Sequence, residues 1–107
     1  MYEAETIEYS IEETIKLAFP EAPETMVAIA KCESSLRQFE LDGVTALKGR
    51  ASSDVGVFQI NYVHWERAER LGIDLHTLEG NIAFAKLLFD NRGTGDWYMS
   101  KHCWGGV

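Results

Sequence analysis

A chain of 107 residues and 12.1 kDa is long enough for one domain with a single hydrophobic core, so we treat residues 1–107 as one domain. Hydrophobic residues make up 46% of the chain and charged residues 25%, a globular composition that excludes a disordered protein. The net charge of −7 comes almost entirely from residues 1–24, and the near-neutral remainder has no basic stripe that would bind nucleic acid.

Two helices are predicted at the start of the chain. Ser10 and Glu13 form a capping-box pattern, which predicts a first helix that ends near Pro20. A second helix begins at Pro23 or Glu24, because proline is tolerated in a first turn. The face of this helix that is expected to be buried has the spacing i, i+3, i+4, i+7 and i+10. The residues at these positions are Met26, Ile29, Ala30, Glu33 and Leu36. A glutamate therefore lies where a helix normally carries a hydrophobic residue.

The rest of the chain predicts one hairpin and more helices. The Asp-Gly pair at residues 42–43 predicts a hairpin turn. A third helix is predicted over residues 61–71 and a fourth over 78–90, followed by a short final segment at 96–104. We therefore expect a mainly α fold, a helical bundle around the glutamate-bearing helix with one small β-hairpin. No apolar run approaches the roughly 20 residues of a membrane span, so we expect no membrane insertion.

The two cysteines are Cys32 and Cys103, 71 positions apart and without a CxxC pattern. His102 beside Cys103 cannot by itself provide a tetrahedral ligand set, so we expect no metal. Two free thiols or one disulfide remain, and the disulfide is the favoured interpretation. A disulfide predicts an oxidising compartment, outside the cell or in the cell envelope.

Glu33 is the strongest candidate for chemistry. A carboxyl group on an apolar helix face loses solvation, which favours its neutral form and raises its pKa. An acid that stays protonated near neutral pH can donate its proton to a leaving oxygen. The alternative is a buried glutamate satisfied by arginine or backbone donors, with no catalytic role.

Four motifs resemble the lysozyme superfamily. Residues 30–35 are similar to the Glu-Ser element that ends its catalytic helix, and residues 56–61 to its Gly-hydrophobic-hydrophobic-Gln-Ile segment. Residues 79–83 are similar to the Asn-Ile element of soluble lytic transglycosylase domains, and residues 95–100 resemble their Trp-rich segment. The resemblance implies a lysozyme-like fold with a cleft for a peptidoglycan strand.

This resemblance implies cleavage of the β-1,4 MurNAc–GlcNAc bond, with Glu33 as general acid and base of a lytic transglycosylase. Asp54, however, resembles the second catalytic carboxylate of c-type lysozymes. The alternatives are therefore a hydrolytic lysozyme that uses Glu33 and Asp54, and a wall-glycan-binding module without catalysis. We expect no cofactor and a monomer.

Further residues are expected to bind the glycan by their position. Gln59 and Asn61 would form hydrogen bonds with acetamido groups, or would be a polar pair satisfied within the loop. Ser34 would polarise the sugar or cap the helix. Trp97 and Tyr98 would stack on a sugar ring or belong to the core. The full expected set is Ser34, Gln59, Asn61, Asn81, Trp97 and Tyr98. We assign Trp65 to the core and His64 to the surface.

Overall fold

The computed structural model describes residues 8–49 and 53–106. Within these ranges the protein is mainly helical, with five α-helices and one two-stranded antiparallel sheet, which confirms the predicted fold class. The elements are α1 (Ile11–Ala18), α2 (Pro23–Ser34), β1 (Asp54–Val55), β2 (Ile60–Asn61), η2 (Tyr62–His64), α3 (Trp65–Arg70), α4 (Leu78–Arg92), η3 (Gly95–Ser100) and α5 (Lys101–Trp104), where η is a 3₁₀ helix.

The first two helices begin where the capping residues predict. The Ser10 hydroxyl accepts a hydrogen bond from the Glu13 amide at 3.1 Å, and the Glu13 carboxylate accepts one from the Ser10 amide at 3.2 Å. Pro23 occupies the first turn of α2, where its missing N–H costs nothing. Ile15 and Phe19 at the end of the first helical segment are fully buried. Local sequence therefore determines both helix starts.

The predicted hairpin around residues 42–43 is a chain reversal without regular strands. Phe39 and Ala46 form only an isolated bridge. Asp42 accepts hydrogen bonds from the amides of Val44 and Thr45, each at 2.8 Å, so its side chain occupies donors that a strand ladder would use. The sheet lies further along, where β1 pairs with β2.

The later helices agree with the expected ranges, with differences at their ends. The third begins as η2, capped by the Asn61 side chain, and continues as α3 until Gly72, which has a φ of +71°. α4 extends two residues beyond the expected end, to Arg92, and the final segment divides into η3 and α5.

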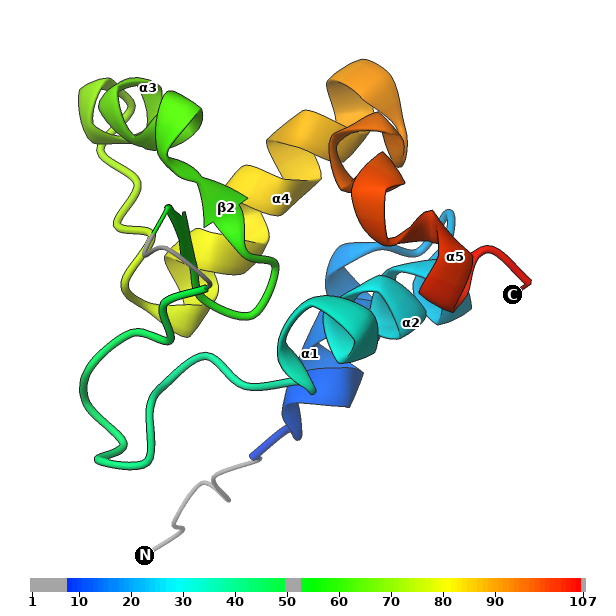
Figure 1. Ribbon diagram of the computed structural model, residues 1–107, viewed down its shortest axis with the longest axis horizontal. Helices are drawn as coiled ribbons and strands as arrows, with labels where there is room; N and C mark the ends of the chain where they lie inside the picture. Colours follow the sequence, from blue (N-terminus) through cyan, green and yellow to red (C-terminus); the bar gives the residue numbers. More distant parts are fainter. Residues whose placement is uncertain (1–7, 50–52, 107) are drawn as a thin grey trace, which may run out of the picture.

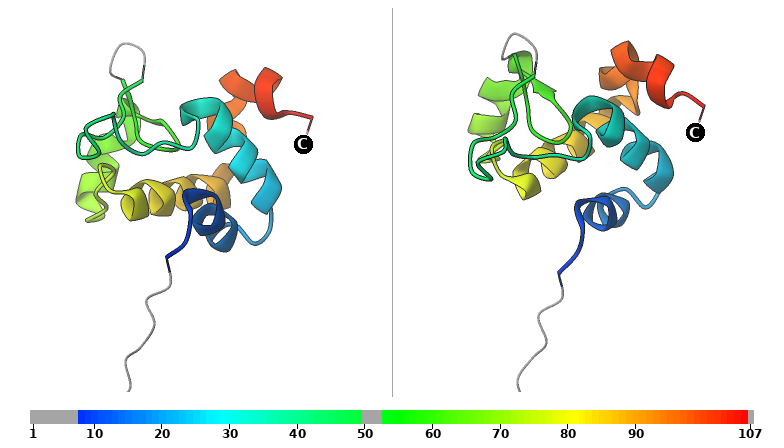
Figure 2. Two further views of the ribbon diagram at one scale, coloured as in Figure 1. Left: turned by 90° about the horizontal axis from the view of Figure 1, so that it is seen from below. Right: turned by 60° about the horizontal axis from the view of Figure 1, so that its bottom comes forward.

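Helix α4 runs between two groups of elements (Figure 1): the sheet with α3 at one end, and α2 with α5 at the other. Figure 2 shows α1 beside α2 and α4. The aromatic core joins these parts, because Phe58 packs against both Phe19 and Trp97 with ring centroids 5.6 and 5.7 Å apart. No helix in the described ranges is long and apolar enough to cross a membrane. A pocket lies between α2, the sheet and η3, and Glu33 lines it.

Candidate active site

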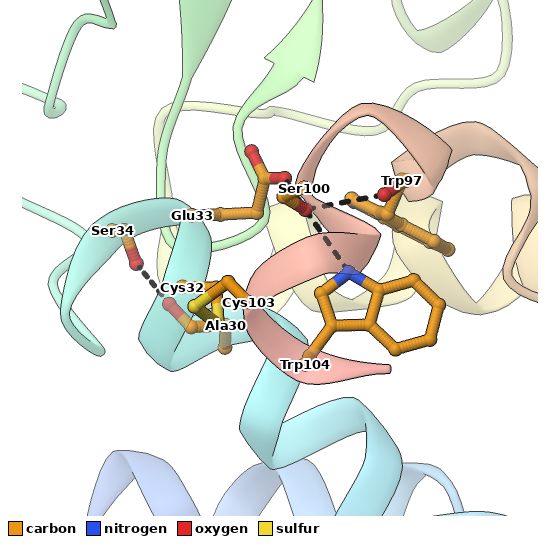
Figure 3. The surroundings of a disulfide bond; sticks show 8 residues. All are labelled: Ala30, Cys32, Glu33, Ser34, Trp97, Ser100, Cys103 and Trp104. Atoms are coloured by element: carbon orange, nitrogen blue, oxygen red, sulfur yellow. Dashed lines mark hydrogen bonds between the residues drawn. A yellow bond between two sulfur atoms is a disulfide. The ribbon is translucent and has the colours of Figure 1, made fainter. Parts of the chain in front are cut away.

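Glu33 lies near the C-terminal end of α2, and its side chain is half-buried. Its Oε2 accepts a hydrogen bond of 2.5 Å from the Ser100 hydroxyl (Figure 3). Burial raises the pKa of the Glu33 carboxyl, the Ser100 hydrogen bond lowers it, and the negative charge of Asp54 raises it, so that the net pKa lies above the ordinary value. Glu33 is therefore an acid that keeps its proton to a higher pH than an exposed glutamate does.

Ser34 ends α2 and connects it to the loop between the strands. Its hydroxyl lies 2.7 Å from the Val57 carbonyl and 3.0 Å from the Ala30 carbonyl, and it accepts from the Arg37 amide at 3.2 Å. The residue is only 8% exposed. The Ser34 hydroxyl is thus buried and bonded to backbone groups, and its role toward a sugar stays a prediction.

Asp54 and Asn61 face each other across the two strands. They are register partners, and the Asn61 Nδ2 donates to Asp54 Oδ1 at 2.8 Å. The Asn61 side-chain oxygen accepts from the Val63 amide at 3.2 Å and so caps η2. One asparagine therefore both starts a helix and orients the second carboxylate.

Asn81, in contrast, is fully buried in the protein. Its Oδ1 accepts from the Phe58 amide at 2.9 Å, and its Nδ2 donates to the carbonyls of Val55 and Leu75 at 2.9 and 3.0 Å. The Asn81 amide thus pairs with backbone groups inside the protein, and its role in substrate binding stays a prediction. Gly56 permits this close packing, since a Cβ there would lie 2.1 Å from the Asn81 amide nitrogen.

A buried glutamine that the sequence analysis missed supports the same loop. Gln38 Oε1 accepts from the Val57 amide at 2.8 Å, and its Nε2 donates to the Leu75 carbonyl at 3.2 Å. Only its position after the end of α2 marks it in the sequence. Gln38 and Asn81 together hold the loop that carries Gln59.

A pocket of about 230 Å³ brings together five of the predicted site residues, among them Glu33, Asp54, Gln59 and Asn61. Trp97 forms part of its wall. The remaining lining residues are Ile60, His64, Leu88, Asp96 and Met99. Two carboxylates from opposite parts of the fold, α2 and β1, thus meet in one pocket.

The two aromatic candidates have different surroundings. Trp97 is 3% exposed, and its indole N–H donates to the Phe58 carbonyl at 3.0 Å, so it belongs to the core as well as to the pocket wall. Tyr98 is 67% exposed and does not line the pocket, which leaves its ring free on the surface beside it.

Three further groups, in the pocket or in contact with Glu33, are not among the site residues expected from the sequence. His64, expected on the surface, lines the pocket with its Nε2 3.6 Å from Asp96 Oδ1. The other oxygen of Asp96 is buried and has no hydrogen-bond partner among the described residues. Ser100 contacts Glu33 directly. His64 reaches the pocket from η2. Asp96 and Ser100 come from η3, after the chain has returned through α4, and short motifs cannot reveal that return.

The predicted disulfide between Cys32 and Cys103 is confirmed, with Cα atoms 6.1 Å apart (Figure 3). It joins α2 to α5 directly beside Glu33. In the part of the chain that the structure describes, no group of three or more His, Cys, Asp or Glu side chains could hold a metal ion.

A larger pocket of about 460 Å³ lies elsewhere, between α3 and residues 72–76. Its lining is mainly apolar and includes Trp65, whose indole N–H donates to the Ile60 carbonyl at 2.9 Å. Trp65 is only partly buried, so it packs at the edge of the core rather than inside it. None of the predicted site residues lines this pocket, and the smaller pocket is the better candidate for chemistry.

Comparison with known proteins gives no match: no protein-family model, no curated protein and no solved structure matches the chain. The pocket and the sequence motifs are therefore the basis for a function.

Proposed function

We propose that this protein cleaves the β-1,4 MurNAc–GlcNAc bond of peptidoglycan, with Glu33 as general acid and base, and that it acts as a lytic transglycosylase. One observation carries the proposal: a half-buried glutamate with a raised pKa shares a pocket with a second carboxylate, Asp54. The order of the four lysozyme-like motifs supports the substrate class. A disulfide beside Glu33 supports action in an oxidising compartment, outside the cell or in the envelope.

The proposed reaction uses both protonation states of Glu33. The neutral carboxyl donates its proton to the glycosidic oxygen, so the bond to C1 of MurNAc breaks and an oxocarbenium-like centre develops. The resulting carboxylate then removes the proton from the C6 hydroxyl of the same sugar. The C6 oxygen attacks C1 as it loses this proton, which leaves a 1,6-anhydro end, and Glu33 is again a neutral acid.

Hydrolysis is the second candidate, and Asp54 favours it. The Asn61 amide fixes its carboxylate, and its charge acts on Glu33. A carboxylate so placed could stabilise or capture the oxocarbenium centre while water completes the reaction. A glycan-binding module without catalysis is the weakest alternative, because binding alone does not require a desolvated acid.

Digestion of purified peptidoglycan tests the proposal. We expect the wild-type protein to clear a wall suspension and to release fragments with anhydro ends, which mass spectrometry distinguishes from reducing ends by the mass of one water. The Glu33→Gln protein keeps the side-chain shape but lacks the proton donor, so its lysis rate should fall by about 10² or more. Glu66→Gln, at an exposed position of α3, serves as the matched control.

Each result decides between the candidates. Reducing ends alone would establish hydrolysis and contradict the transglycosylase. Binding of the glycan without any release of fragments would establish the binding module. Near-normal lysis by a folded Glu33→Gln protein would remove Glu33 from the mechanism.

A further inference from the structure

Ser100 contacts three polar groups at once. Its Oγ lies 2.5 Å from Glu33 Oε2, 3.1 Å from the Trp97 carbonyl oxygen and 3.0 Å from the Trp104 indole nitrogen (Figure 3). A serine hydroxyl has one proton to donate and two lone pairs that accept. An indole N–H only donates, so Trp104 occupies one lone pair permanently.

The Ser100 proton and its second lone pair can then be arranged in two ways, one for the ionised and one for the neutral form of Glu33. When Glu33 is a carboxylate, it only accepts, and Ser100 donates to it. When Glu33 is a carboxylic acid, its O–H donates into the free lone pair of Ser100. The Ser100 proton then turns to the Trp97 carbonyl, 3.1 Å away. Ser100 is hydrogen-bonded to Glu33 and to Trp104 in both states, and no heavy atom has to move.

We propose that Ser100 is a two-state positioning residue, whose hydroxyl turns between Glu33 and the Trp97 carbonyl as Glu33 loses and regains its proton, with Trp104 holding the oxygen in place. The inference rests on the proposed function, which needs Glu33 first as acid and then as base. A side chain that fits only one state would favour that state and slow the other step.

The surroundings of Glu33 agree with this role. Burial raises the pKa of Glu33, whereas the Ser100 hydrogen bond lowers it, so the serine keeps the carboxylate accessible in a partly desolvated place. Trp104 is 5% exposed and lies one helical turn from Ser100. The disulfide at Cys103 fixes this turn against α2. Packing and a covalent bond therefore hold Ser100 and Trp104, which we call the relay, next to Glu33.

The indole N–H of Trp104 provides a readout that does not need activity. The protein has three tryptophans, so an ¹⁵N–¹H NMR spectrum has three indole signals. We expect the Trp104 signal to shift with pH at the same midpoint as the Glu33 carboxyl carbon. The Trp65 indole, bonded to the Ile60 carbonyl in another pocket, should not follow that midpoint. Glu33→Gln should abolish the Trp104 shift.

The Glu33 charge could also shift the Trp104 signal directly through space, without the Ser100 hydroxyl. Ser100→Ala distinguishes this effect from the relay. Without the hydroxyl, the Trp104 signal should no longer follow Glu33, and the Glu33 midpoint should rise, because the carboxylate has lost a donor. The other titratable groups of this pocket are Asp54, His64 and Asp96. The Asp54→Asn protein should therefore still show the Trp104 shift at the Glu33 midpoint.

Activity adds a second readout. Ser100→Ala should lower the lysis rate about tenfold and move the alkaline limb of the pH profile upward, and Ser100→Thr should restore both. Should Ser100→Ala fail to fold, Trp104→Phe takes its place and should raise the Glu33 midpoint. A Trp104 signal that stays constant while Glu33 titrates would overturn the relay. So would an equal shift in Ser100→Ala, or an unchanged Glu33 midpoint in both variants. An intact titration in a protein that cleaves no glycan would instead contradict the proposed function alone.

Discussion

Glu33 is a carboxyl group whose ionisation costs the folded protein stability. Its folded-state pKa is raised above that of the unfolded chain, mainly by burial. The stability it contributes is full below the unfolded pKa, about 4.3, and is lost as the pH rises through the folded value. The same raised pKa predicts that the proton donor is lost, and activity falls, on the alkaline side of the profile.

Glu33→Gln should therefore stabilise the protein in a pH-dependent way. Glutamine does not ionise, so we expect the variant to melt higher than wild type at pH 8 and nearly equal to it at pH 4. Thermal unfolding by circular dichroism at both pH values measures the difference, with Glu66→Gln as the exposed control. A stability gap that is the same at both pH values would contradict a raised pKa.

Asp54 decides between the two reactions. We expect Asp54→Asn to reduce the lysis rate by about tenfold, less than Glu33→Gln does, and to leave anhydro products, because the transglycosylase needs only one acid and base. Mass spectrometry of the fragments checks the products. Asp90→Asn, at an exposed position of α4, controls for the loss of one negative charge. Wild-type products with reducing ends only, together with no cleavage by Asp54→Asn, would identify a lysozyme.

The loop between β1 and β2 is held by hydrogen bonds from α4. Asn81 supplies the partners of three backbone groups in or near that loop. Asn81→Ala removes the acceptor of the buried Phe58 amide and one donor each from the Val55 and Leu75 carbonyls. We therefore expect the free energy of unfolding to fall by about 3 kcal/mol. Urea denaturation measures the change. Asn91→Ala, exposed on the same helix, should change it by less than about 0.5 kcal/mol. Equal effects at both positions would show that this buried amide does not support the loop.

The disulfide is the other tie between elements. Replacing Cys32 and Cys103 by serine opens a closure of 71 residues, which the chain-entropy model values at about 4 kcal/mol. We expect the urea midpoint of the double variant, and of the reduced wild type, to fall accordingly. A midpoint that is unchanged by reduction would mean that packing between α2 and α5 alone holds this region.

The structural features that the sequence predicts correctly are mostly those that neighbouring residues determine. Ser10 and Pro23 start helices through their own chemistry, and the helical spacing of α2 identifies Glu33 as unusual. The position of the sheet is different. Asp42 and Gly43 carry the stronger local hairpin pattern, but the strands form at residues 54–61.

The reason is that the later loop is stabilised from a distance. Gln38, Asn81 and Trp97 donate to or accept from its backbone, and they come from three separate parts of the chain. Ser100 is likewise placed beside Glu33 only because the chain returns through α4. The type of each residue is visible in the sequence, but which groups meet depends on the tertiary fold.

The disulfide also closes a covalent ring, which runs from α2 through both strands and α4 to α5. Among the described residues of this ring, Leu41 and Val44 are the most exposed large hydrophobic ones, at 96% and 79%, and their turn is a favourable site for proteases. We expect chymotrypsin to cut after Leu41 first. Because that cut lies inside the ring, the two fragments should migrate together on a non-reducing gel and separate only after reduction.

The Cys103→Ser protein is the control, and its fragments should separate without a reductant. Separation of wild-type fragments without reduction, or a first cut outside residues 32–103, would contradict the expectation. Glu33 and Ser100 lie on different fragments, on either side of this cut, yet the bond beside them keeps the fragments in one molecule. A protein that is cut after Leu41 therefore keeps a covalent link at the pocket, and this cut does not release the two fragments from each other.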